Sequence, residues 1–390
     1  MNFLYSLFLF FGIIPFLIKN FSLQRLGFCL PKIKPDIWIH CASVGEIAGI
    51  KPFIDELRKT RSLSIIVSTI TKTGDQVARG FGEIAIYLPI DFSFIIRSVL
   101  KRLSPKILII QERELWPNLI REAKRQGIKI ALINGRISEK SKKRYLAVSS
   151  LMKGVISCFD LFLMQTEDDK NRIKELGPEN DKIFITGNTK FDWLYKDIPD
   201  IKLKFEDKNI IVFGSIRERE EEIILKCAKR LVLEKKVSVV IAPRHIDRAS
   251  IILKNKGFIR RSSASYVPSC SIVILDTIGE LRSFYKKAKI TFVGGSLFPY
   301  GCHNLIEPAI LGKPVLFGRY PDNFKDCANS LKKDKGGFEI SDEASLFSQI
   351  SYLLENPDQL KKMGKNAKDV ALNLIGASKR CIPFILNLLH

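Results

Sequence analysis

Glycines, polar side chains and a carboxylate are concentrated between residues 276 and 324. An apolar run over 290–293 ends at Gly294-Gly295, and polar residues then lead into an expected helix that carries Glu307. Glycine lets a backbone approach a ligand closely, and the N-terminus of a helix offers unpaired N–H groups to a phosphate. A carboxylate in the same helix suits the paired hydroxyls of a ribose. The stretch therefore predicts a nucleotide-binding site.

A second candidate lies in Ser43-Val-Gly-Glu46, directly after an apolar run that ends at His40. Glu46 is expected in the first turn of a helix. It is either a carboxylate that stabilises the helix dipole or a general base. Because a helix N-terminus lowers the pKa of a carboxylate, we expect Glu46 to be ionised, as a base must be.

Charged residues also follow two other expected strands of the first half. In Gln111-Glu-Arg-Glu-Leu-Trp-Pro-Asn118, Glu112 and Glu114 flank an arginine. They form either a structural ion cluster or part of an active site. Lys190 lies in Thr186-Gly-Asn-Thr-Lys-Phe-Asp192, from which a lysine can reach into an interdomain cleft.

Two features of the second half bear on phosphate and metal binding. Arg244, in Pro243-Arg-His245, follows a strand and can pair with a phosphate. His303 and Glu307 stand one helical turn apart, which raises the question of a metal site. No third ligand is near in sequence and there is no Asp-x-Asp, so we predict no metal. The P-loop and Gly-x-Gly-x-x-Gly patterns are also absent.

Short apolar, β-branched runs recur along the chain, with stretches between them that are long enough for helices. The first set is 36–40, 63–68, 84–88, 106–111, 128–133, 160–165 and 182–186, and the second is 209–214, 237–242, 271–275, 289–293 and 314–317. Continuous hydrophobicity is typical of strands covered on both faces, and hence of parallel sheets with crossover helices. The fold class is therefore α/β, with two doubly wound Rossmann-like domains facing a cleft.

We predict an apolar anchor over 1–20, a first Rossmann-like domain over 21–195, a linker over 196–208, a second such domain over 209–365 and a C-terminal helix over 366–390. The anchor rests on residues 3–18, which contain no charge and are followed by basic residues. The run lacks the features of a cleaved signal and is slightly short for a comfortable bilayer span. It is expected to insert into a membrane or lie on it, with the body of the protein in the cytoplasm. A buried first helix is the alternative. The final helices could pack on either domain.

Composition indicates an anionic partner. The net charge is +22, and the window 97–153 holds 15 basic and 4 acidic residues. Nucleic acid, anionic lipid, an acidic substrate and an ordinary solvated basic face all remain open. The eight cysteines show no Cys-x-x-Cys spacing, which favours reduced thiols in a cytosolic compartment.

These motifs, in this order and over nearly the whole chain, resemble those of the bacterial Kdo (3-deoxy-D-manno-octulosonic acid) transferases, which have the two-Rossmann-domain GT-B fold. The shared segments are Ser-Val-Gly-Glu, Glu-Leu-Trp-Pro-Asn, Pro-Arg-His, Gly-Glu-Leu and Val-Gly-Gly-Ser-Leu. Cys302 stands where the family usually has Gly, Arg113 replaces a usual Thr, and Gly135 replaces a usual Ala.

The resemblance implies inverting, metal-independent transfer of Kdo from CMP-Kdo to a lipid A precursor at the cytoplasmic face of the inner membrane, with no cofactor. Glu46 falls on the family's catalytic base, and Glu112 and Lys190 fall on positions thought to stabilise the transition state. The CMP-binding segments correspond to Pro243, Arg244, Ile278, Gly279, Glu280, Asn304, Leu305, Ile306 and Glu307.

Two other functions are alternatives. One is a GT-B enzyme that uses a UDP-sugar. The other is a basic, membrane-peripheral nucleic-acid-binding protein, which should interleave aromatic residues with its basic ones. Between residues 97 and 153 only Trp116 and Tyr145 are aromatic, which weakens that interpretation, and we expect no nucleic acid partner.

Overall fold

The computed structural model describes residues 22–195, 198, 200–254 and 257–389. The chain divides into two compact units, each described by itself below. The first comprises the chain up to Trp193 together with the residues from Leu374, and the second is Leu194–Asn373. The expected anchor over 1–20 lies outside the described residues. Within the described ranges, no helix combines the length and apolar character needed to cross a bilayer.

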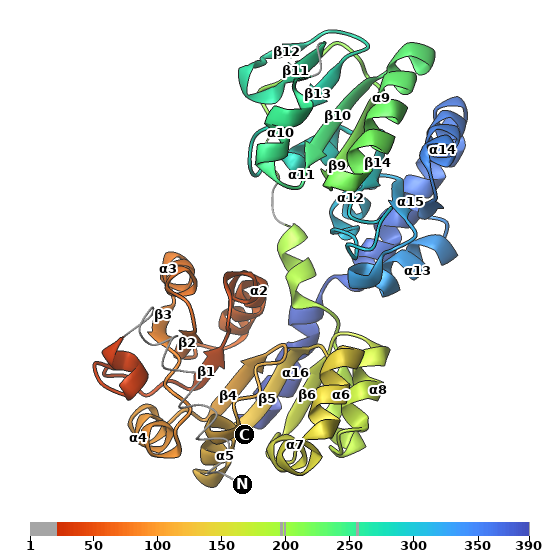
Figure 1. Ribbon diagram of the computed structural model, residues 1–390. Helices are drawn as coiled ribbons and strands as arrows, with labels where there is room; N and C mark the ends of the chain where they lie inside the picture. Colours follow the sequence, from red (N-terminus) through yellow and green to blue (C-terminus); the bar gives the residue numbers. More distant parts are fainter. Residues whose placement is uncertain (1–21, 196–197, 199, 255–256, 390) are drawn as a thin grey trace. The chain divides into compact units, whose positions relative to one another are not determined.

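The first unit is built on a seven-stranded parallel sheet of order β3-β2-β1-β4-β5-β6-β7 (Figure 1). Its strands are β1 (Ile37–His40), β2 (Ile65–Thr69), β3 (Ile84–Tyr87), β4 (Ile107–Gln111), β5 (Lys129–Gly135), β6 (Leu161–Met164) and β7 (Ile183–Ile185). Its helices are α2 (Val44–Thr60), α3 (Lys72–Gly80), α4 (Ser93–Leu103), α5 (Pro117–Arg125), α6 (Glu139–Ala147), α7 (Ser149–Ile156), α8 (Glu167–Lys174) and α16 (Ala377–Leu388).

The second unit contains another seven-stranded parallel sheet, of order β11-β13-β10-β9-β14-β15-β16, and a two-stranded sheet of β8 and β12. The strands are β8 (Lys204–Phe205), β9 (Ile210–Ile216), β10 (Ser238–Pro243), β11 (Phe258–Arg260), β12 (Tyr266–Val267), β13 (Ile272–Ile274), β14 (Ile290–Val293), β15 (Val315–Gly318) and β16 (Gly337–Ile340). The helices are α9 (Glu221–Lys235), α10 (Ile246–Ile252), α11 (Leu281–Lys287), α12 (Ile306–Ile310), α13 (Lys325–Lys333), α14 (Glu343–Glu355) and α15 (Pro357–Leu374). Short 3₁₀ helices, named η, cover Leu23–Leu26, Asn180–Lys182, Thr189–Tyr195, Glu218–Glu220, Arg261–Ser263 and Asp322–Phe324.

Burial on both faces of each sheet explains the continuous apolar runs. In β1, Trp38 packs into one core cluster and Ile39 into another on the opposite face, and neither side chain is exposed. The second sheet repeats this arrangement with Phe213 and Val212 of β9. Both predicted parallel sheets are therefore confirmed. The strands β8, β11, β12 and β16 were missed because each has only two to four residues and is partly exposed, which leaves no continuous apolar run.

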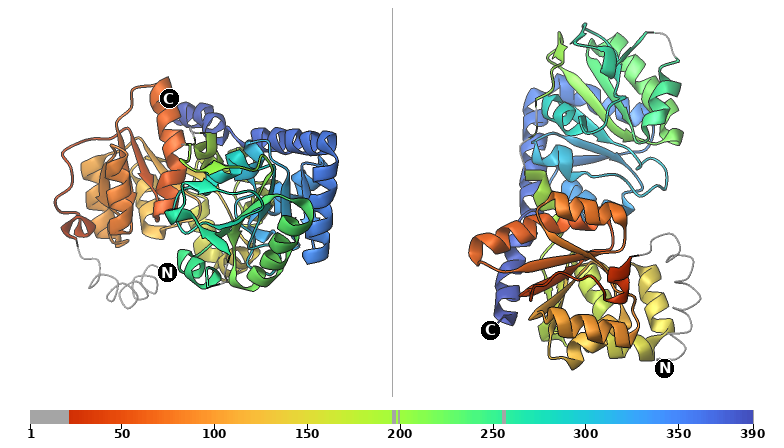
Figure 2. Two further views of the ribbon diagram at one scale, coloured as in Figure 1. Left: turned by 90° about the horizontal axis from the view of Figure 1, so that it is seen from above. Right: turned by 90° about the vertical axis from the view of Figure 1, so that its left-hand side faces the viewer.

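The last helix returns to the first unit. The α15 helix ends at Leu374, Gly376 follows with φ +89°, and α16 then packs against α2. The Asp192 carboxylate accepts the backbone N–H groups of Gly376 (2.6 Å) and Ser378 (2.7 Å), which caps the start of α16. Figure 2 shows this C-terminal helix, in dark blue, from two further sides. The packing of the final helix, which the sequence left open, is thereby decided.

Candidate functional site

Glu46 is held rigidly in the first turn of α2. Its side chain is 8% exposed. One carboxylate oxygen accepts the backbone N–H of Ala42 (2.8 Å), and the other accepts the hydroxyl of Ser43 (3.2 Å). The Ser43 hydroxyl oxygen in turn accepts the backbone N–H of Glu46 (3.3 Å). This reciprocal capping arrangement fixes the carboxylate at the helix start.

The expected pKa of Glu46 is wrong in direction. Burial raises the pKa of Glu46 to about 7, and the negative charges of Glu112 and Glu114 add to that effect. The N–H of Ala42 and the ammonium of Lys190 act in the opposite direction but do not compensate for burial. Desolvation therefore outweighs the helix dipole. A carboxyl group with this pKa exchanges a proton readily near neutral pH, which suits a general base.

Glu112 and Lys190 form an ion pair in the same unit. Glu112 directly follows β4 with φ +60°, a conformation that is uncommon for a residue with a Cβ. The stem of Lys190 lies over Gly49, one turn after Glu46 in α2. A Cβ at Gly49 would stand 2.4 Å from Cγ of Lys190, so only glycine leaves room for this path. The structure thus brings the three predicted catalytic residues of the first half together.

His40 has a structural role in the core of the first unit. Its side chain is fully buried at the end of β1, and burial lowers its pKa to about 4. The ring atom Nδ1 lies 3.0 Å from the hydroxyl of Ser68, which also accepts the indole N–H of Trp38 (2.8 Å). A neutral, buried imidazole of this kind contributes to the core of the sheet.

In the second unit, a buried carboxylate that sequence reasoning missed organises the glycine-containing loop after β14. Glu220 is not exposed, and its oxygens accept the backbone N–H groups of Gly295 (2.7 Å), Ser296 (2.9 Å), Leu297 (2.9 Å) and Arg217 (2.9 Å). Glu220 lies among several acidic residues of similar appearance in the sequence. Only its burial distinguishes it from them.

The predicted helix with Glu307 is present as α12, which has only five residues. Asn304 accepts the backbone N–H of Ile306 (3.0 Å) and donates to Glu307 (3.3 Å). Burial raises the pKa of Glu307, while Arg282, Asn304 and Arg244 oppose that shift. The Leu305 and Ile306 side chains are fully buried, so these two predicted site residues can offer a ligand only their backbone.

Basic side chains gather beside this loop. Burial lowers the pKa of His303 to about 4, and the nearby charges of Arg244, Arg217 and His245 lower it further. Nη1 of Arg217 donates to Nε2 of His245 (2.7 Å), and the Arg217 guanidinium stacks over Tyr300 at 4.7 Å from the ring centroid. Nε2 of His303 is buried without a hydrogen-bond partner among the described residues. This cluster, Arg217, Arg244, His245 and His303, is suited to an anion.

The remaining predicted nucleotide-binding residues lie at strand ends of the same unit. Ile278 is 85% exposed, Gly279 has φ +88°, and Glu280 accepts a hydrogen bond from Arg261 (2.6 Å). Pro243 ends β10. In the described part of the chain, no three His, Cys, Asp or Glu side chains are close enough to hold a metal ion.

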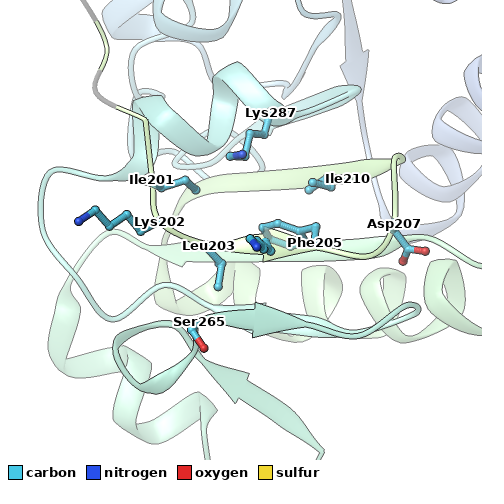
Figure 3. A pocket seen from close by; sticks show the side chains of 9 residues that line it. Ile201, Lys202, Leu203, Phe205, Asp207, Ile210, Ser265 and Lys287 are labelled. Atoms are coloured by element: carbon cyan, nitrogen blue, oxygen red, sulfur yellow. The ribbon is translucent and has the colours of Figure 1, made fainter.

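A pocket of about 770 Å³ lies elsewhere in the second unit (Figure 3). Its lining residues are Ile201, Lys202, Leu203, Lys204, Phe205, Asp207, Ile210, Ser265 and Lys287. None of them is a predicted site residue. The candidate nucleotide-binding residues, which lie near Glu220, Glu307 and the basic cluster, do not line this pocket.

The two parallel-sheet domains and the nucleotide-type loop define a GT-B-like architecture. The UDP-GlcNAc 2-epimerase of Neisseria meningitidis, solved with UDP-GlcNAc, shares this fold with a TM-score of 0.65 at 17% identity, covering 90% of this chain and 99% of that one.

A family model described as 3-deoxy-D-manno-octulosonic-acid transferase (kdotransferase) matches residues 22–193. The Haemophilus influenzae 3-deoxy-D-manno-octulosonic acid transferase is 32% identical over 385 residues, covering 93% of this chain and 90% of the relative. The chain therefore belongs to the 3-deoxy-D-manno-octulosonic acid (Kdo) transferase family of glycosyltransferases, which confirms the resemblance found in the motifs. A bifunctional glycosyltransferase/methyltransferase of Fusobacterium nucleatum is also 32% identical, covering 92% of this chain, which spans 59% of that longer protein.

Proposed function

We propose that this enzyme transfers Kdo from CMP-Kdo to a hydroxyl of a lipid A precursor, with inversion at the anomeric carbon and without a metal. The observation that carries the proposal is the rigid Glu46 carboxylate, with a pKa of about 7, beside the Glu112–Lys190 ion pair. Glu46 takes the proton of the acceptor hydroxyl. The acceptor oxygen then forms a bond to the anomeric carbon as the bond from that carbon to the CMP phosphate oxygen breaks.

The second unit is proposed to bind the donor. The basic cluster and the N–H groups near Asn304 stabilise the negative charge that develops on CMP as it departs. Glu307 accepts hydrogen bonds from the ribose hydroxyls. Lys190 either stabilises that developing charge or holds the Kdo carboxylate. Both roles require a cation at this position, and the ion pair with Glu112 holds the Lys190 ammonium there.

The exposed side chains of helix α6 favour two partners, an acidic, acylated acceptor and an anionic membrane surface. The helix has no buried residue. Lys140, Lys143 and Arg144 on it have no carboxylate partner among the described residues, and Leu146 and Val148 beside them are 40% and 49% exposed. Cations next to apolar side chains suit a phosphorylated, acylated molecule. We place the protein at the cytoplasmic side of the inner membrane, held there by the segment over 1–20.

The direct test is incubation of the purified protein with CMP-Kdo and a tetraacylated lipid A precursor, with products resolved by mass spectrometry. Addition of Kdo is expected from the wild type and none from Glu46→Ala, which should bind CMP as the wild type does. Turnover by Glu46→Ala would exclude Glu46 as the base. Binding of UDP at least tenfold tighter than CMP would overturn the donor.

Membrane attachment is tested separately. A variant without residues 1–18 should leave the membrane fraction and still modify acceptor solubilised in detergent. Unchanged membrane association of this variant would refute the anchor.

A further inference from the structure

Asn134 connects the segments that carry Glu112 and Lys190. It lies near the end of β5, its side chain is not exposed, and its φ is +57°. Asn is among the few residues other than Gly that tolerate this left-handed conformation. Most other residues would be strained in this backbone conformation.

The amide group of Asn134 contacts both segments at once. Its Oδ1 accepts the backbone N–H of Thr189 (3.1 Å), and its Nδ2 lies 3.5 Å from Oε1 of Glu112, a long hydrogen bond. The chemistry of the partners fixes the orientation of the amide, because an N–H group requires an acceptor and a carboxylate requires a donor. Thr189 is fully buried and immediately precedes Lys190, so this contact positions the lysine.

A second route joins Asn134 to Lys190. The backbone carbonyl of Asn134 accepts Nε2 of Gln165 (3.0 Å), whose Oε1 accepts Nδ2 of Asn188 (3.2 Å). Oδ1 of Asn188 accepts the backbone N–H of Lys190 (3.0 Å). The backbone at Lys190 is thus held by Asn134 in two ways, through the Asn134 side chain and through the Asn134 backbone carbonyl.

The backbone of Glu112 is tied to the same strand. Its N–H donates to the carbonyl of Ile133 (3.0 Å), and its own carbonyl accepts the N–H of Arg136 (3.4 Å). The Glu112 backbone is therefore hydrogen-bonded on both sides of Asn134, to Ile133 in β5 and to Arg136 directly after this strand. A neutral amide here meets the carboxylate without adding charge to a group of residues that already includes Glu46, Glu112 and Glu114.

We infer that Asn134 is a positioning residue for the transfer reaction: it sets the Glu112 carboxylate and the Lys190 ammonium opposite each other. The inference rests on the proposed roles of Glu112 and Lys190. Asn134 itself touches neither substrate nor reacting atoms in this assignment. Its effect should therefore appear in turnover more than in donor binding.

Two variants separate the contacts. Asn134→Asp keeps the shape, the tolerance of positive φ and the acceptor for Thr189, but faces Glu112 with a second carboxylate. Asn134→Gly removes both contacts without straining the backbone. For each, kcat is expected to fall about 10- to 100-fold with the KM for CMP-Kdo within about twofold of the wild-type value. Wild-type kcat in Asn134→Asp would overturn the inference, and so would a change confined to KM.

A second measurement does not depend on activity. Trace acetylation with limiting acetic anhydride reports how freely an amine reacts, and Lys204, exposed in the second unit, serves as the internal reference. Lys190 should acetylate at least threefold faster relative to Lys204 in Asn134→Gly than in the wild type, because its pairing with Glu112 is weakened when both side-chain contacts of Asn134 are removed. An unchanged ratio would refute the positioning role even if the wild type failed to transfer Kdo.

Ser104→Gly controls for the backbone effect of a glycine at positive φ, at an exposed position. Ser104 also has positive φ (+46°) and lies in the same unit, at the end of α4. This variant should keep wild-type kcat and the wild-type acetylation ratio. A loss equal to that of Asn134→Gly would show that the effect comes from any glycine at positive φ and would overturn the inference.

Discussion

Lys190 crosses helix α2 directly above Gly49, which has no side chain to obstruct it. The lysine follows β7, whereas its ion-pair partner Glu112 follows β4. The absence of one Cβ thus allows a cation from the end of the first domain to reach a carboxylate near its centre.

Gly49→Ala should reduce transfer without reducing stability. The new Cβ would stand 2.4 Å from Cγ of Lys190 and displace it. Within a helix, Ala is favoured over Gly by about 0.5–1 kcal/mol, so the free energy of unfolding should stay equal or rise. Assays of kcat alongside urea unfolding test this. Gly80→Ala, where a Cβ meets nothing within 4 Å, is the control. Wild-type kcat in Gly49→Ala would contradict the prediction.

The pH dependence of turnover should follow Glu46. Because the base must be ionised and its pKa is about 7, kcat/KM should fall about tenfold per pH unit well below pH 7. The sign for stability follows from the same shift. The folded state holds the proton more tightly than the unfolded chain, so Glu46 lowers the free energy of unfolding as pH rises from about 4.5 to about 7.

Glu46→Gln should therefore unfold at higher urea concentration than the wild type at pH 8 and show a smaller difference at pH 5. The gain at pH 8 is expected to be on the order of 1–3 kcal/mol, reduced by any weakening of the bond from Ala42. An acid limb centred near pH 4.5 in the wild-type rate profile would refute the raised pKa.

Glu220→Gln should destabilise the second domain. A carboxylate accepts all four backbone N–H groups found here, whereas an amide has one oxygen and turns an NH₂ group toward some of those donors. A loss of about 2–4 kcal/mol is expected, together with weaker CMP binding. Urea unfolding and CMP titration measure the two effects. Glu222→Gln, at an adjacent site on α9, provides the comparison, and equal stability of both variants would argue against the role of Glu220.

Arg217→Ala should weaken CMP binding about tenfold or more at low salt, and Arg217→Lys should restore part of the loss. The guanidinium lies among Arg244, His245 and His303, where an anion is expected. Arg219→Ala is the matched control, because Arg219 stacks on Phe298 at 4.4 Å instead. Calorimetric titration with CMP at two salt concentrations is the measurement. Equal affinities of the two alanine variants would remove Arg217 from the donor site.

Much of the fold can be predicted from local sequence patterns. The twelve expected strands appear at their predicted places, because strands buried on both faces require uninterrupted apolar runs. Strand ends with glycines or charges likewise marked Glu46, Glu112, Lys190, Arg244 and Glu307. Glu46, Glu112, Lys190 and Arg244 are candidates because open α/β sheets hold ligands at the carboxyl ends of their strands, whereas Glu307 is a candidate through the helix expected after the glycine pair.

The sequence by itself determined the α/β class, the family and the candidate residues, because periodicity and short motifs are local properties of the chain. Only the tertiary structure decided that Glu220, among many glutamates, is the one that holds the loop after β14. It also decided that α16 packs on α2 and that Glu46 has a raised pKa. Burial and long-range hydrogen bonding set these properties. Both depend on residues far apart in the chain, and neither can be read from a motif.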